Sequence, residues 1–115
     1  MITLIEDDEG LISALKALFK SKEFKMQHFT SGESYLENID NDSNKLGSFE
    51  NVNYLEAGVI LLDVRLPGIS GLEVYERQRQ IIPFNHKPIL IMTGHGEVDM
   101  AVSALKNGAY DFLTK

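Results

Sequence analysis

Residues 59–68 read VILLDVRLPG, in which four consecutive apolar residues lead directly into an aspartate and then into a loop with proline and glycine. A short, continuously apolar run is typical of an interior strand of a parallel sheet, because both faces of such a strand are covered. We therefore expect a buried strand over residues 59–62, with Asp63 at its carboxyl end.

Four more short apolar runs, at residues 2–5, 24–29, 88–92 and 110–114, are expected to be strands. Between them, apolar residues recur at helical spacing in residues 11–19 and 98–105. Short strands alternating with helices predict an α/β fold with a doubly wound parallel sheet.

Residues that start or stop helices set the expected limits of these elements. Thr30 with Glu33 fits a capping box, Ser70 can cap a following helix, and Asn107-Gly108 is a stop signal, which gives four helices in all. Residues 38–54 are rich in Asn, Asp, Ser, Lys and Gly and are expected to form a long solvated loop.

Length and composition limit the class of protein. A chain of 115 residues with 43% hydrophobic and 24% charged residues fits one domain, spanning residues 1–115. The absence of cysteine excludes disulfides and thiol chemistry and fits a reducing, cytoplasmic location. The net charge of -6 argues against nucleic-acid binding by this domain, and neither a secretion signal nor a membrane span is visible.

Polar residues follow four of the expected strands, at the edge of an open parallel sheet where ligands bind. They are Glu6, Asp7, Asp8, Asp63, Thr93 and Lys115. Carboxylates gathered at one edge repel each other unless a cation lies between them, and Mg²⁺ prefers carboxylate oxygens. An aspartate beside such an ion can attack a phosphoryl group, with a lysine ammonium and a threonine hydroxyl balancing its other oxygens. Asp63 is the best candidate for the nucleophile.

Each of these residues also has an ordinary interpretation. Glu6 and Asp7 could be acids favoured by a helix dipole, Asp8 a helix cap, Asp63 a turn former and Lys115 a surface charge. Their joint placement at successive strand ends is what favours a shared site.

Four segments stand out together: residues 4–9 (LIEDDE), 61–68 (LLDVRLPG), 92–96 (MTGHG) and 108–115 (GAYDFLTK). They resemble the matching segments in the receiver domains of bacterial two-component response regulators. Residues 93–96 also resemble the receivers of regulators of nitrogen regulation and fixation. The resemblance implies a flavodoxin-like fold with strand order 2-1-3-4-5.

The resemblance also implies a role for each matching residue. Asp63 would accept a phosphoryl group from a sensor histidine kinase. Asp7, Asp63 and the backbone carbonyl of Arg65 would bind Mg²⁺, for which Mn²⁺ could substitute, with Glu6 acting through water.

Further residues would respond to phosphorylation or tune it. Thr93 and Phe112 would form the conformational switch, with Lys115 completing the site, while Arg65 and His95 would tune dephosphorylation. The ordinary alternatives are that Phe112 is a core residue and that His95 is an exposed histidine in a loop.

By the same resemblance the chain is not an enzyme acting on an outside substrate: it would catalyse phosphotransfer to, and hydrolysis from, its own Asp63. The expected partners are the kinase, a transcriptional effector domain beyond the carboxyl terminus, and a second copy in a homodimer. No membrane partner is expected.

Two departures from the family are visible. The interval between Asp7 and Asp63 is longer than usual, with the excess in residues 38–54, and the chain stops at Lys115, where the family continues through a final helix. A sheet face left uncovered by that helix would favour association.

Two other functions compete with this interpretation. A phosphatase or dehalogenase is expected to carry a second acid two residues after its nucleophile, where Arg65 stands instead. A degenerate receiver, acting as a binding module independent of phosphorylation, is expected to lack one of the key residues, and none of them is missing.

Overall fold

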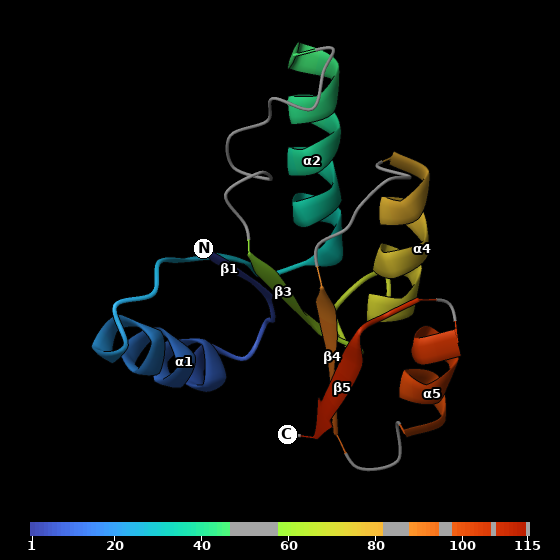
Figure 1. Cartoon of the computed structure of the whole chain (residues 1–115). Coiled ribbons are helices and arrows are strands. Elements are labelled where there is room, and N and C mark those ends of the chain that lie inside the picture. The colour runs from blue at the N-terminus through green and yellow to red at the C-terminus, as the bar shows by residue number, and fades with distance from the viewer. Residues whose placement is uncertain (47–57, 82–87, 95–97, 107, 115) are drawn as a thin grey trace.

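The computed structural model describes residues 1–46, 58–81, 88–94, 98–106 and 108–114 (Figure 1). Strands and helices alternate along the chain, as the sequence predicts. The strands are β1 (Ile2–Ile5), β2 (Met26–Phe29), β3 (Val59–Asp63), β4 (Ile89–Thr93) and β5 (Asp111–Thr114). The helices are α1 (Glu9–Ser21), α2 (Gly32–Leu46), α4 (Gly71–Ile81) and α5 (Val98–Lys106). None of these described helices is long and apolar enough to cross a membrane.

The five strands form one parallel sheet in the order β2-β1-β3-β4-β5, which confirms the expected order. In the register of the central strands, Ile5 pairs with Leu62 and Asp63 pairs with Met92. The carboxyl ends of all five strands therefore meet along one edge of the sheet, which is where the polar residues follow.

Side chains alternate between the two faces of the sheet, because successive residues of a strand point in opposite directions. Ile5, Leu62 and Ile91 belong to a core cluster that also contains residues of α2, α4 and α5. Leu4 and Leu61 belong to a second cluster, which contains residues of α1. One helix thus covers one face, and three described helices cover the other.

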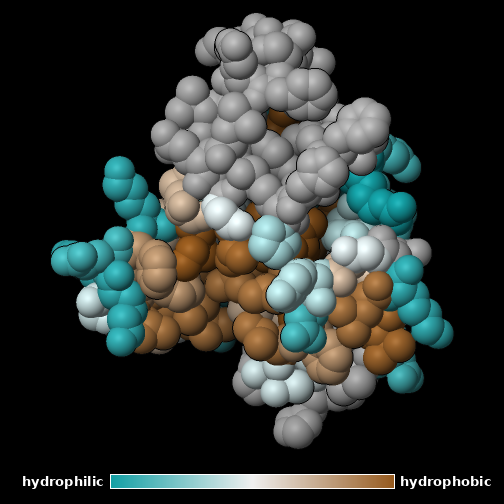
Figure 2. All heavy atoms as spheres, viewed as in Figure 1, coloured by the Kyte–Doolittle hydropathy of each residue, from teal (hydrophilic) through white to brown (hydrophobic). Residues whose placement is uncertain are grey.

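The face that carries α1 is incompletely covered near β5. Figure 2 shows apolar side chains on the surface between α1 and β5. Leu113 pairs with Met92 of the second cluster and keeps 48% of its surface exposed. In the described part of the chain, α1 alone covers this face, and the sheet near β5 stays exposed.

Three helices begin at side-chain caps. Asp8 Oδ1 accepts from the backbone N–H groups of Gly10 (2.9 Å) and Leu11 (3.2 Å), and Ser70 Oγ accepts from that of Glu73 (3.2 Å). The expected cap at Thr30 is wrong by one residue: Ser31 Oγ accepts from Ser34 N (3.2 Å). The reason is that α2 begins at Gly32, which puts Ser31 directly before the first turn.

Helix α2 is longer than the sequence predicts. It continues to Leu46, so the loop expected over residues 38–54 is wrong for residues 38–46, and residues 47–54 lie outside the described part. Ile39 is buried in the first core cluster, and this packing outweighs the weak helix propensity of the Asn, Asp and Ser residues that follow.

Helix α2 packs closely on α4. Gly32 lies so near Val74 that a Cβ at position 32 would overlap with the valine side chain. In the buried interface the hydroxyl of Tyr35 donates to Oε1 of Gln78 at 2.7 Å. The start of α2 is therefore fixed beside α4 and beside the loop that precedes α4.

Candidate functional site

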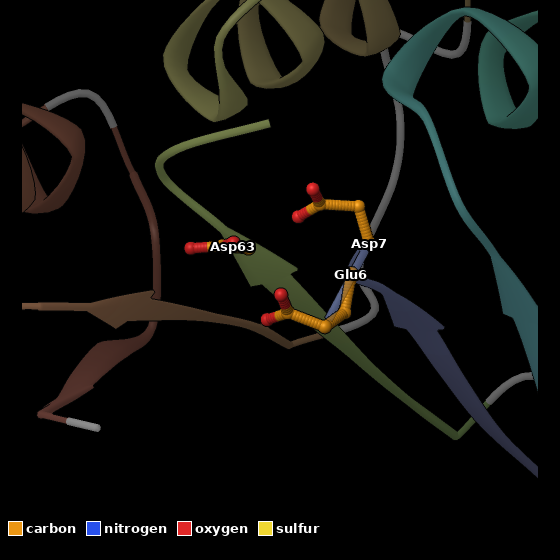
Figure 3. A group of neighbouring side chains, drawn as sticks. All are labelled: Glu6, Asp7 and Asp63. Carbon is orange, nitrogen blue, oxygen red and sulfur yellow. The ribbon is translucent and has the colours of Figure 1, made fainter. Parts of the chain in front are cut away.

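Three carboxylates gather at the carboxyl ends of β1 and β3. Glu6 and Asp7 follow β1, and Asp63 is the last residue of β3. One oxygen from each lies within 4.8 Å of the others. Figure 3 shows the three side chains at the ends of these two strands. Glu6 and Asp63 are buried, with 0% and 1% of their surface exposed, whereas Asp7 faces solvent. The site is therefore acidic: it is buried at Glu6 and Asp63 and open to solvent at Asp7.

Backbone groups hold two of these carboxylates in place. Glu6 Oε1 accepts from the N–H of Asp8 (3.2 Å), and Asp63 Oδ1 accepts from the N–H of Arg65 (3.2 Å). Asp8 itself turns away to cap α1, so the interpretation of Asp8 as a helix cap is confirmed. The backbone of Arg65 lies next to the candidate nucleophile, and its side chain is exposed.

The donor set fits a small, hard divalent cation. Mg²⁺ binds oxygens at about 2.0–2.1 Å, so ligands on opposite sides of the ion stand about 4 Å apart. The oxygens of Asp7 and Asp63, within 4.8 Å of each other, need only a small contraction to reach that separation. An all-oxygen donor set suits Mg²⁺ or Mn²⁺ better than metals that prefer nitrogen or sulfur.

The start of α4 fixes the backbone of Asp63. The N–H of Gly71 donates to the carbonyl of Val64 (2.8 Å), and a Cβ at position 71 would overlap with the carbonyl oxygen of Asp63. Only glycine allows this approach, so Gly71 shapes the backbone at the site, as its place in the loop after Asp63 predicts.

Glu33 is a residue near the site whose place the sequence did not predict. The pattern suggested a capping box, but Glu33 Oε1 accepts from the backbone N–H of Ile69 (3.4 Å), in the loop between β3 and α4. Its carboxylate also lies against Gly68. No local signal could have revealed this contact, because it joins residues 36 positions apart.

Thr93 ends β4 and is fully buried. Its hydroxyl donates to the backbone carbonyl of Leu113 in β5 at 3.4 Å, and its Cα pairs with that of Thr114. Phe112, on the same strand, is half-buried against the first core cluster and pairs with Ile91. Thr93 on β4 and Phe112 on β5 thus lie on adjacent strands, and the hydrogen bond of Thr93 goes to Leu113, the residue that follows Phe112. Lys115 and His95 lie outside the described residues.

Comparisons with known proteins agree with this geometry. The family model described as "Response regulator receiver domain" matches residues 2–115. The chain is 36% identical to the response regulator protein TmoT of Ectopseudomonas mendocina, over 100% of this chain and 46% of that protein. It is 37% identical to the transcriptional regulatory protein FixJ of Bradyrhizobium diazoefficiens, over 99% of this chain and 48% of that protein. The chain therefore spans about half the length of these relatives.

Solved structures resemble the fold over nearly the whole chain. A response regulator receiver domain protein from Clostridium thermocellum matches with a TM-score of 0.78 and 25% identity. The match covers 99% of this chain and 80% of the Clostridium thermocellum chain. Full-length FixJ from B. japonicum matches with a TM-score of 0.75 and 37% identity. The match covers 99% of this chain and 49% of the FixJ chain. With its sheet order, its acidic edge and these matches, the chain belongs to the receiver domains of response regulators.

Proposed function

We propose that this receiver accepts a phosphoryl group on Asp63 from a sensor histidine kinase, with Mg²⁺ bound by Asp7, Asp63 and the backbone carbonyl of Arg65, and by Glu6 through water. The observation that carries the proposal is the convergence of three carboxylates within 4.8 Å, two of them buried. Such a cluster is unfavourable without a cation, and this cost is what a binding site for Mg²⁺ would relieve.

In the proposed transfer, a carboxylate oxygen of Asp63 attacks the phosphorus of the kinase phosphohistidine. A P–O bond to Asp63 forms while the P–N bond breaks, and the histidine nitrogen leaves with the electron pair. The hydrogen bond from the N–H of Arg65 orients the attacking carboxylate. Bound Mg²⁺ would supply the positive charge that allows two anions to approach. Later attack by water would return phosphate and free Asp63, at a rate tuned by Arg65 and His95.

We further propose that the acyl phosphate changes the partner of Thr93. The hydroxyl that now donates to Leu113 O would turn to a phosphoryl oxygen, Lys115 would pair with another, and Phe112 would repack. Moving a two-state equilibrium from mostly off to mostly on takes about 5.5 kcal/mol. Charge-assisted hydrogen bonds, each stronger than the neutral one replaced, are a suitable source.

The output of the switch would lie in another domain. The relatives are about twice as long as this chain, and FixJ is named a transcriptional regulator, so we propose an effector domain after the receiver in a cytoplasmic protein. With a net charge of -6, the receiver itself is a poor ligand for DNA. A homodimer is a further proposed assembly.

Incubation with Mg²⁺ and acetyl phosphate, followed by intact-mass measurement, tests the nucleophile. The wild-type chain should gain one phosphoryl group, and Asp63→Asn should gain none, because an amide oxygen is a far weaker nucleophile than a carboxylate. Asp99→Asn, at an exposed position in α5, is the matched control and should behave as wild type.

Two results would contradict the proposal. A phosphoryl gain that persists in Asp63→Asn places the nucleophile elsewhere. No gain by the wild type, together with no Mg²⁺ binding, would favour the binding module that works without phosphorylation.

A further inference from the structure

Glu33 contacts the β3–α4 loop (residues 64–70) at two adjacent points. Its Oε1 accepts from the backbone N–H of Ile69, and its carboxylate fills the space beside Gly68. Gly68 has φ +76°, so the loop bends there through a conformation that favours glycine. The carboxylate therefore lies where a side chain at position 68 would point.

Steric fit between the two residues is close. A Cβ at position 68 would overlap with Oε2 of Glu33, so the missing side chain of Gly68 is what leaves room for the carboxylate. An acid in the first turn of a helix gains from the helix dipole wherever its side chain points. The dipole therefore explains why an acid is favourable at position 33, but not why it lies over this bend.

The loop joins the nucleophile to α4. Its two ends are fixed by local hydrogen bonds. The N–H of Arg65 donates to Oδ1 of Asp63, and the N–H of Gly71 donates to the carbonyl of Val64. Glu33 comes from a different element, and α2 is itself held on α4 by the close packing of Gly32 against Val74. The contact thus ties the bend of the loop to a fixed point outside it.

We propose that Glu33 is a positioning residue for the metal site: it holds the β3–α4 loop in the curvature that keeps the backbone carbonyl of Arg65 available to Mg²⁺. This inference rests on the proposed function, which assigns that carbonyl to the metal. Glu33 itself is no ligand in this proposal. Its effect is exerted through the backbone of Gly68 and Ile69.

Three variants test the inference, with Mg²⁺ affinity measured by isothermal titration calorimetry. Glu33→Ala removes the acceptor and should weaken Mg²⁺ binding about tenfold, the lower end of the range for residues that orient metal ligands. Glu33→Gln keeps an oxygen that can accept from Ile69 N–H and should stay within about twofold of wild type. Glu37→Ala, an exposed acid one turn later in α2, is the matched control and should have no effect.

Amide hydrogen exchange gives a readout that does not depend on the metal. The exchange of the Ile69 N–H should accelerate in Glu33→Ala and stay slow in Glu33→Gln, measured without Mg²⁺. If Glu33→Ala binds Mg²⁺ as well as wild type, the inference is wrong. If Glu33→Gln loses as much affinity as Glu33→Ala, the effect is one of charge and positioning is again refuted. Failure of the proposed function looks different: the wild type itself would then bind no Mg²⁺ and gain no phosphoryl group.

Discussion

The two halves of the functional edge are built differently. The acid half, at the ends of the interior strands β1 and β3, contains Glu6, Asp7 and Asp63, with two of the three carboxylates buried and both of these held by backbone N–H groups. The hydroxyl half, at the ends of β4 and β5, presents Thr93, whose hydroxyl is bonded to the carbonyl of Leu113.

Under the proposed function, this difference separates the binding of Mg²⁺ from the response to phosphorylation. The acid half needs only a small contraction to bind a cation, so its geometry is largely formed in advance. The hydroxyl half already has a partner, at the long distance of 3.4 Å, on a four-residue strand whose side chains are mostly exposed. A weak bond on a lightly packed strand is readily exchanged for a charge-assisted one.

The largest expected change in the free energy of unfolding comes from a substitution in the acid half. Gly71→Ala should lower the free energy of unfolding by about 3 kcal/mol, the upper end for overpacking, because the new Cβ overlaps with the carbonyl of Asp63. Urea denaturation measures this change. Gly58→Ala is the control, since its Cβ would stand 3.6 Å from the nearest atom. Equal stability of the two variants would show that the acid half is not held rigidly.

Removal of one acid should separate metal binding from stability. Asp7→Asn is expected to weaken Mg²⁺ at least tenfold, a loss of about 1.4 kcal/mol, and to raise the melting temperature without metal, since it removes one of three repelling charges. Thermal unfolding with Mg²⁺ and with EDTA measures both effects. A variant that is less stable than wild type in EDTA would argue that the cluster is not repulsive.

Thr93→Val probes the hydroxyl half with little change in shape. The carbonyl of Leu113 loses its donor, so the free energy of unfolding should fall by about 1 kcal/mol, while Mg²⁺ affinity stays within about twofold of wild type. Chemical shifts of β5 on addition of beryllofluoride should no longer change as in the wild type. The separation of the two halves fails if this variant binds Mg²⁺ as weakly as Asp7→Asn.

The smallest expected effect concerns Tyr75, whose hydroxyl lies beside Gly108 in the turn before β5. Burial raises the pKa of Tyr75 above 10.0; Arg79 partly offsets this, and Glu76 adds to it. Because the pKa is higher in the folded state, the associated stability is fully present below pH 10 and is lost as pH rises through the folded pKa. Urea denaturation at pH 8 and at alkaline pH should show a shallower loss for Tyr75→Phe than for wild type. Identical pH profiles would contradict this.

Much of this architecture could be predicted from the sequence, because it depends on local patterns. Continuous apolar runs locate the interior strands, and parallel strands bring their carboxyl ends to one edge, so Glu6, Asp7 and Asp63 are found together. The cap at Asp8 is likewise a local feature of one turn.

The features that could not be predicted depend on tertiary packing. Helix α2 passes through a segment of weak helix formers because Ile39 is buried against the sheet. Glu33 lies over Gly68 because two segments 36 positions apart meet at a bend. Ser31 caps α2 in place of Thr30 because both residue types can cap and only the path of the chain selects between them.

The buried hydrogen bond between Tyr35 and Gln78 has a consequence for how this family member can evolve. Loss of Tyr35 alone would leave Oε1 of Gln78 buried without this donor, at a cost of about 1–3 kcal/mol. Replacement of both by apolar residues of similar shape avoids that cost. Substitutions at positions 35 and 78 are therefore expected to occur together across close relatives.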